Sequence, residues 1–316
     1  MVSVYSSKRR QGGFSLVEMM VTSAIGLLML SAVVGLFLSS SYSAKQTSIR
    51  SGLYENGRYA LLTLNDELRA AGFWGGAHSV DIIQSGTLNA IGTDCAGAAA
   101  GYDLNNNLWA IKAASANAIG CLTDAKSDSD ILVIKHVDQE PTAVGSINTQ
   151  RTYVMSNTTK GVLFDGADTL PTTTDGGDVP GGVAWEYFST IYYVSNNGDG
   201  VPTLYRKRLV SNQWGAKEEV ALGVERLYIQ FGVDSSGDGV ADSFRDAANA
   251  DWSSIVSAHV YLLVRSENKN NSYTDGKNYL LGDVTVDAVN DHYHRLVFDT
   301  SVNLRNRKLM AAAGLL

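Results

Sequence analysis

The sequence predicts an α+β protein in which one long N-terminal helix packs on an antiparallel β-sheet. Three observations lead to this fold class: an apolar run at residues 14–38, a stripe at helical spacing that continues to residue 71, and a series of strand-like segments beyond residue 129. No helix of comparable strength separates those later segments, so antiparallel pairing is favoured over βαβ units.

The first element is a helix long enough to cross a membrane. Between Phe14 and Leu38 the only charged residue is Glu18, and most of the run is Phe, Leu, Val, Met, Ala or Ile. At about 1.5 Å per residue, such a run spans a bilayer core of about 30 Å. Basic residues at positions 8–10 precede it, which predicts that the N-terminus stays in the cytoplasm and that the chain beyond Leu38 is exported.

Beyond the membrane the helix is predicted to continue as an amphipathic segment. Charged residues alternate with one stripe at steps of three and four, made of Ile49, Leu53, Asn56, Ala60, Leu61, Leu64, Leu68 and Ala71. Gly72, Gly75 and Gly76 then end the helix. We therefore expect a helix over residues 14–72 whose second half lays its stripe on a globular domain.

The rest of the chain, residues 73–316, is predicted to be that globular, β-rich domain. Clusters of Gly, Asn and Asp separate segments rich in Val, Ile, Tyr and Phe, which lie at 130–137, 185–194, 203–210, 224–233, 255–264 and 294–304. These segments predict the strands of the sheet.

The chain has two cysteines, Cys95 and Cys121. Export places them in an oxidising compartment, where a pair is more often bridged than free. We expect a disulfide that closes a loop rich in Gly, Ala and Asn and stabilises the fold by about 3–4 kcal/mol. Two isolated cysteines without neighbouring histidines are too few ligands for zinc.

A Gly-rich loop at residues 234–242 offers oxygen ligands. Asp234, Ser236, Asp238 and Asp242 occupy positions one, three, five and nine of the loop, which predicts a candidate Ca²⁺ site. Arg245 stands where an EF-hand carries its bidentate glutamate, so the full hand is absent. The alternative is a metal-free hairpin turn. No other cofactor is implied.

The charge balance and the scattered histidines restrict the classes of function. The formal net charge is −7, so direct binding of nucleic acid is not expected. A short basic stretch at 205–208 is interpreted as the solvated edge of a strand. The sequence has no P-loop, no zinc-protease helix and no nucleophile elbow, and we expect no enzyme activity.

The N-terminal segment closely resembles the class III signal of type IV prepilins. The resemblance rests on the basic leader, Gly13, Phe14, the apolar run and Glu18 four residues after the phenylalanine. In that family a prepilin peptidase cuts after the glycine and methylates the new amino terminus. The resemblance implies that residues 1–13 are a leader, that residues 14–38 lie in the membrane or the filament core, and that Glu18 meets the free amino terminus of a neighbouring subunit. The alternative is that Glu18 only reaches to the membrane interface.

Beyond the leader, the sequence is most similar to the PilW-type minor pilins. The similarity lies at 56–60, 66–73, 129–133, Tyr205 with Arg206, the 234–242 loop, and 302–307. It implies a minor pilin that takes part in initiating type IV pilus assembly and sits at the pilus tip. The implied partners are other minor pilins, the major pilin, the prepilin peptidase and the inner membrane.

The resemblance also implies a location in the inner membrane, with one span, a periplasmic C-terminal domain and later incorporation in the pilus. Two alternatives stay open at the level of the sequence. A type II secretion pseudopilin would share the leader and Glu18. A membrane-anchored periplasmic protein of other function would need a pocket of clustered titratable groups that the sequence does not indicate.

Overall fold

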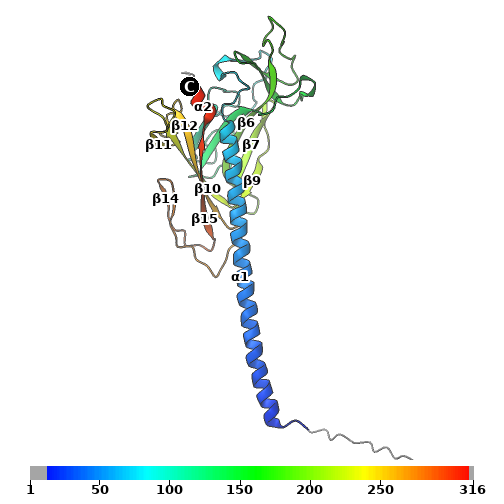
Figure 1. Ribbon diagram of the computed structural model, residues 1–316, viewed down its shortest axis with the longest axis vertical. Helices are drawn as coiled ribbons and strands as arrows, with labels where there is room; N and C mark the ends of the chain where they lie inside the picture. The colour runs from blue at the N-terminus through cyan, green and yellow to red at the C-terminus, as the bar shows by residue number, and fades with distance from the viewer. Residues whose placement is uncertain (1–12, 313–316) are drawn as a thin grey trace, which may run out of the picture. The chain divides into compact units, whose positions relative to one another are not determined.

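The structure is a computed structural model and describes residues 13–312 of the chain. The chain divides into two compact units, with the boundary between Ser51 and Gly52. Helix α1 (Leu16–Ala70) runs through this boundary, so each unit contains part of it (Figure 1). The helix thus begins two residues after the expected start at Phe14 and ends two residues before the expected boundary at residue 72.

The first unit is the N-terminal part of α1. Its apolar side chains are exposed along the whole run, with Phe14 80% and Leu36 73% exposed. The helix is long and apolar enough to cross a membrane. A Cβ atom added at Gly26 or Gly35 would meet nothing within 4 Å, and the helix is continuous through both positions.

The second unit contains a nine-stranded sheet (Figure 1). Its strands are β1 (Ile82–Gln84), β2 (Leu108–Lys112), β3 (Asp130–Val137), β4 (Thr152–Ser156), β5 (Gly161–Asp165), β6 (Val183–Asn196), β7 (Pro202–Val210), β8 (Gln213–Trp214) and β9 (Glu218–Leu222). The main path runs β1-β5-β4-β6-β3-β2, and β7 joins β6 to β8 and β9. The pairs are antiparallel except for β1 with β5, which is parallel.

The second large sheet of this unit has four antiparallel strands. It has the order β11-β10-β12-β15 and consists of β10 (Val224–Val233), β11 (Ser243–Asp246), β12 (Ile255–Arg265) and β15 (Arg295–Asn303). A small hairpin of β13 (Tyr279–Leu281) and β14 (Val284–Val286) precedes β15, and helix α2 (Arg305–Ala312) follows it. Three 3-10 turns lie at Ser79–Asp81, Gly97–Ala99 and Val144–Ser146.

The six predicted strand segments coincide with β3, β6, β7, β10, β12 and β15, within two residues at each end. The strands that the sequence did not predict are mostly two to five residues long, too short to show a clear alternation. One interpretation was wrong. Residues 205–208 are not a solvated strand edge, because Tyr205 and Arg206 pair with both β6 and β9, and Lys207 and Arg208 are half-buried.

Two adjacent polar side chains join the two large sheets. The Oδ2 atom of Asp130, the first residue of β3, accepts a hydrogen bond from the backbone N–H of Ile229 in β10 at 2.8 Å. The hydroxyl oxygen of Ser129 accepts one from the N–H of Leu227 at 3.0 Å. Asp130 is only 2% exposed, and this burial raises the pKa of its carboxyl to about 7.

In the second unit, α1 packs on the sheets through the predicted stripe. Leu53, Ala60, Leu64 and Leu68 are all buried. At Gly57 the helix approaches β15 so closely that an added Cβ atom would lie 2.5 Å from the ring of Phe298. The stripe therefore needs a glycine at this one position as well as apolar side chains at the others.

The last turn of α1 is closed by contacts with distant segments. Gly72 has a φ of +73°, which favours glycine, and its N–H donates to the carbonyl of Lys135 at 3.0 Å. The amide of Asn306 in α2 donates to the carbonyl oxygens of Arg69, Ala70 and Ala71 at 3.2–3.4 Å. These bonds satisfy carbonyls that the helix itself leaves without a partner.

Candidate functional site

The first candidate site is the start of α1. Gly13 and Phe14 precede the helix, and Glu18 lies in its first turn, where the positive end of the helix dipole favours a carboxylate. Within residues 13–312, no hydrogen bond or ion pair reaches the Glu18 carboxylate, although its carbonyl oxygen accepts a bond from the Thr22 hydroxyl at 2.8 Å. The basic leader at positions 8–10 lies outside the described residues.

This arrangement leaves one carboxylate, without a partner among the described residues, on the apolar and exposed part of the helix. In hydrocarbon an ionised carboxylate is strongly disfavoured unless a cation or a donor meets it. Glu18 can therefore act as an acceptor for a positive group supplied by another molecule.

The second candidate site lies near the other end of α1, where Glu67 contacts the nine-stranded sheet. Its Oε2 atom lies 3.2 Å from Nε2 of His136 in β3, and its Oε1 atom lies 3.5 Å from Nη2 of Arg208 in β7. Burial acts to raise the pKa of Glu67, but hydrogen bonding and charge interaction with His136, together with the charge of Arg208, lower it below its usual value. This contact anchors the helix to two strands.

The helical pattern does not mark Glu67 as a contact residue, because its position on the helix says nothing about the strands that reach it. The nearest signal was the basic stretch at 205–208, which was assigned to solvent.

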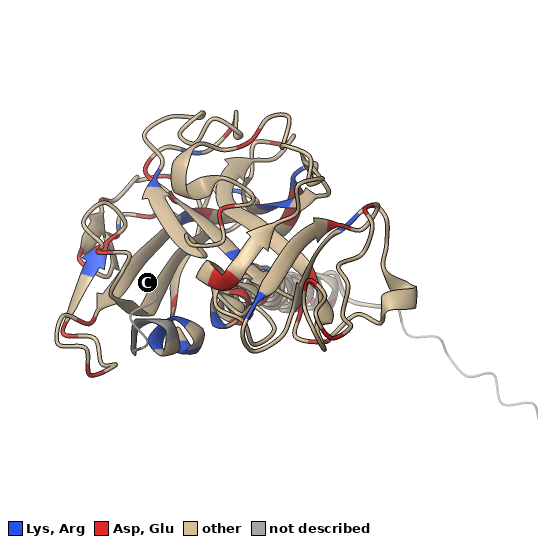
Figure 2. Cartoon of the chain, turned by 90° about the horizontal axis from the view of Figure 1, so that it is seen from above, with Lys and Arg blue, Asp and Glu red and all other residues tan. Residues whose placement is uncertain are grey.

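That basic stretch is occupied by contacts within the protein. Arg206 Nε lies 2.7 Å from Glu218, Lys207 Nζ donates to the carbonyl of Cys121 at 3.1 Å, and Arg208 reaches Glu67. In Figure 2, the positions of basic and acidic residues are interspersed along the ribbon. The three cations of this stretch therefore have partners in the chain itself.

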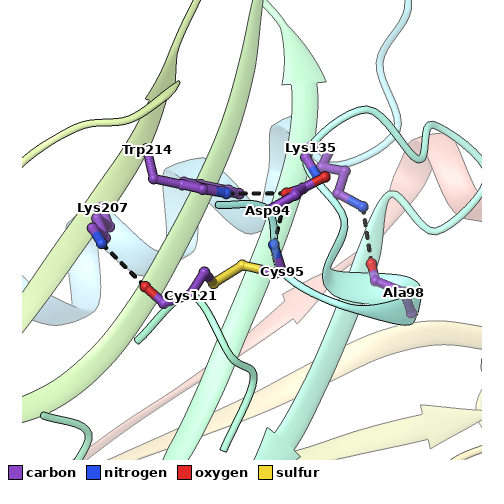
Figure 3. Close-up of a disulfide and its surroundings, with 8 residues drawn as sticks. Asp94, Cys95, Ala98, Cys121, Lys135, Lys207 and Trp214 are labelled. Atoms are coloured by element: carbon purple, nitrogen blue, oxygen red, sulfur yellow. Dashed lines mark hydrogen bonds between the residues drawn. A yellow bond between two sulfur atoms is a disulfide. The ribbon is translucent and has the colours of Figure 1, made fainter. Parts of the chain in front are cut away.

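Cys95 and Cys121 form a disulfide in the structure, which confirms the predicted pairing (Figure 3). Their Cα atoms lie 4.8 Å apart, and both residues are buried in a core cluster with residues of β3, β6 and β7. The bridge closes a segment that is more than the expected loop, because it contains β2 of the nine-stranded sheet.

Two polar side chains attach this segment to the sheet (Figure 3). The Asp94 carboxylate accepts hydrogen bonds from the indole of Trp214 at 3.1 Å and from the N–H of Gly101 at 3.0 Å. The ammonium of Lys135, a fully buried residue of β3, donates to the carbonyls of Ala98 and Asp103, both at 2.9 Å. Burial lowers the pKa of Lys135 to about 8.

The 234–242 loop follows β10. Asp234 accepts hydrogen bonds from the N–H groups of Gly237 and Gly239, both at 2.7 Å, and from the Ser236 hydroxyl at 3.2 Å. Asp242 accepts bonds from Ser235, and the Asp238 carboxylate accepts one from the N–H of Val240 at 2.8 Å. No group of three or more His, Cys, Asp or Glu side chains with metal-binding geometry occurs within residues 13–312. Calcium binding at Asp234, Ser236, Asp238 and Asp242 stays a prediction.

The described geometry thus consists of an apolar, exposed helix that carries one acid, and a β-rich unit. Comparison with known families assigns both ends of the chain. Residues 8–34 match the prokaryotic N-terminal methylation motif, which together with the apolar helix defines a pilin with a single span in the inner membrane and a C-terminal domain. Residues 191–306 match the Type IV Pilus-assembly protein W family, PilW. Together the two matches support a PilW-type minor pilin.

No curated protein matches the chain. Among solved structures, the type IV-like pilin TTHA1219 from Thermus thermophilus is 13% identical, with a TM-score of 0.30 over 58% of this chain and 82% of that one. PilW is a family of structural proteins, and it implies interaction with other components of the pilus.

Proposed function

We propose that this protein takes part in initiating type IV pilus assembly and sits at the pilus tip. The observation that carries the proposal is the carboxylate of Glu18, which lies four residues after Phe14 on an exposed apolar helix and has no partner among residues 13–312. The N-terminal methylation motif over residues 8–34 and the PilW match support it.

In this proposal the prepilin peptidase removes residues 1–13 and methylates the amino group of Phe14. The mature helix keeps residues 14–38 in the membrane until they enter the filament core, and the domain from residue 73 onward faces the periplasm. Glu18 of one subunit pairs with the amino terminus of another, because an isolated carboxylate and an isolated ammonium are both costly in hydrocarbon. The partners are other minor pilins and the major pilin.

The first test is the mass of the mature N-terminus in native membranes, with and without the prepilin peptidase. We expect an N-methylated Phe14 that is lost when the peptidase is absent. A retained leader, or a mature end at any other position, would refute the proposal.

The second test separates insertion from assembly. Glu18→Ala should leave the protein in the membrane but abolish its recovery with the other minor pilins and lower the number of surface pili. Glu55→Ala, an exposed acid of the same helix beyond the apolar run, is the matched control and should behave like the wild type. Normal co-assembly of Glu18→Ala would contradict the proposed role.

Gold labelling at pilus ends tests the tip location.

A further inference from the structure

A polar cavity of about 890 Å³ lies in the second unit, at the C-terminal end of α1. Asp66, Arg69 and Phe73 line one side, and Gln139 lines the wall beyond β3. The end of β15 and the start of α2 supply the rest of the wall, including Arg305.

Two stretches that carry the family resemblance, 66–73 and 302–307, meet at this cavity. Most of their residues have a structural task. In the first, Glu67 contacts His136 and Arg208, Leu68, Ala70 and Ala71 are buried, and Gly72 closes the helix. In the second, Val302 and Leu304 are buried, Asn306 caps α1, and Arg307 donates to Asn107 at 2.6 Å.

The remaining polar residues of both stretches face the cavity. Asp66, Arg69, Asn303 and Arg305 line it and are exposed, and no side-chain hydrogen bond or ion pair involves them in the part of the chain that the structure describes. Asp66 and Arg69 lie more than 200 residues before Asn303 and Arg305, so the meeting of the two pairs is a result of the fold. Neither packing nor helix capping explains them.

The charges in this cavity favour an anionic ligand. Arg69 and Arg305 supply two guanidinium groups, against one carboxylate from Asp66. The nearby carbonyls at the end of α1 already accept hydrogen bonds from Asn306, so the arginines are not needed to satisfy them. Guanidinium groups bind carboxylates with two parallel hydrogen bonds, which gives such contacts both strength and direction.

The backbone beside the cavity favours a polypeptide over a free ion. Ser301 and Asn303 belong to β15, which is the last strand of its sheet and pairs only with β12 among the described strands. An edge strand offers free N–H and C=O groups to an incoming extended chain. The side-chain amides of Gln139 and Asn303 add donors and acceptors suited to peptide groups.

We propose that this cavity binds an extended, acidic segment of another pilin subunit, with a carboxylate of that segment held by Arg69 and Arg305. The inference rests on the proposed function, since it supplies the periplasmic contact of the same assembly that Glu18 joins in the membrane. The two contacts lie on different parts of α1 and can be tested separately.

The test uses the full-length protein in cells that make the other pilus subunits. A photo-cross-linking residue replaces Ser301 in the cavity or Thr158, an exposed control position in the β4–β5 turn. We expect Ser301 to cross-link to another pilin subunit at a segment that contains Asp or Glu, identified by mass spectrometry, and Thr158 not to do so.

Charge reversal then tests the arginines. Arg305→Glu should lower the yield of this cross-link by about tenfold or more, as expected for a close charge pair. Arg58→Glu, an exposed arginine of α1 that does not line the cavity, is the matched control and should leave the yield unchanged. Replacing the cross-linked acid of the partner by Arg should restore the yield in Arg305→Glu.

Several outcomes would overturn the inference. These are no cross-link from Ser301, a cross-link only to lipid or to a second copy of this chain, and a yield that does not respond to Arg305→Glu. The melting temperature of each variant establishes that a lost cross-link does not reflect unfolding. If Phe14 is methylated and Glu18→Ala blocks assembly while Ser301 gives no cross-link, the proposed function stands and this inference fails.

Discussion

Replacing Asp130 by Asn should stabilise the protein, and the gain should depend on pH. Asp130 is buried where β3 meets β10, and burial raises its carboxyl pKa from 3.8 to about 7. Because the folded pKa is raised, the folded state holds the proton more strongly than the unfolded state does. The free energy of unfolding therefore falls as the pH rises from about 4 to about 7, and the loss of stability is complete above pH 7.

The magnitude follows from the shift of the pKa. At about 1.4 kcal/mol per unit, the shift corresponds to a cost of about 4 kcal/mol above pH 7. The Asp130 carboxylate accepts a hydrogen bond from the N–H of Ile229 at 2.8 Å, and the side-chain oxygen of Asn can accept the same bond. The stability difference between Asp130→Asn and the wild type should thus grow by about 4 kcal/mol between pH 4 and pH 8.

The assay is denaturant unfolding of the full-length protein in detergent at several pH values. Other titrating groups are common to both proteins and cancel in the difference. Asp128→Asn is the matched control, because Asp128 is exposed, its pKa is lowered by the hydrogen bond from Lys112, and its φ of 63° suits Asn. It should give a small loss of stability. A difference for Asp130→Asn that does not change with pH would refute the reasoning.

Glu67→Gln should cost about 1–3 kcal/mol at pH 7 in the same unfolding assay, because it removes the charged partner of a mostly buried contact. The pKa of Glu67 is lowered, so its stabilisation is present above the unfolded value and is lost as the pH falls through the folded one; equal losses at pH 3 and pH 7 would contradict this. Gly57→Ala should destabilise by about 1–3 kcal/mol through its contact with Phe298, whereas Gly52→Ala, in open space, should stabilise by about 0.5–1 kcal/mol. A gain from both would show that α1 does not approach β15 so closely. Cys95→Ser should lower the free energy of unfolding by about 3 kcal/mol relative to the oxidised wild type, and a loss that persists against the reduced wild type would exclude the disulfide as its cause.

Much of the fold could be predicted because its signals are local. The stripe from Leu53 to Leu68 repeats every three or four residues and is buried as expected. Each predicted strand carries enough Val, Ile and Tyr to be recognised without its neighbours. The parallel pair of β1 with β5 and the short strands could not be predicted, since three to five residues do not establish a period.

The candidate sites divide in the same way. Gly13, Phe14 and Glu18 form one contiguous motif, and the family match over residues 8–34 confirms its class. The pairing of Cys95 with Cys121 needed no structure, because the chain offers no other choice. The sequence singled out the two stretches that contain Arg69 and Arg305, but it did not predict that they meet in one cavity, because they are far apart in the chain.

The sequence by itself therefore determined the membrane-spanning helix, the positions of the main strands along the chain, the disulfide and the class of protein. Only the tertiary structure decided which charged residues are held inside. It assigned Arg208 to Glu67 instead of solvent, and it buried Asp130 between two sheets. The physical reason is that periodicity and motifs depend on neighbours in sequence, whereas burial and charge pairing depend on segments that folding brings together.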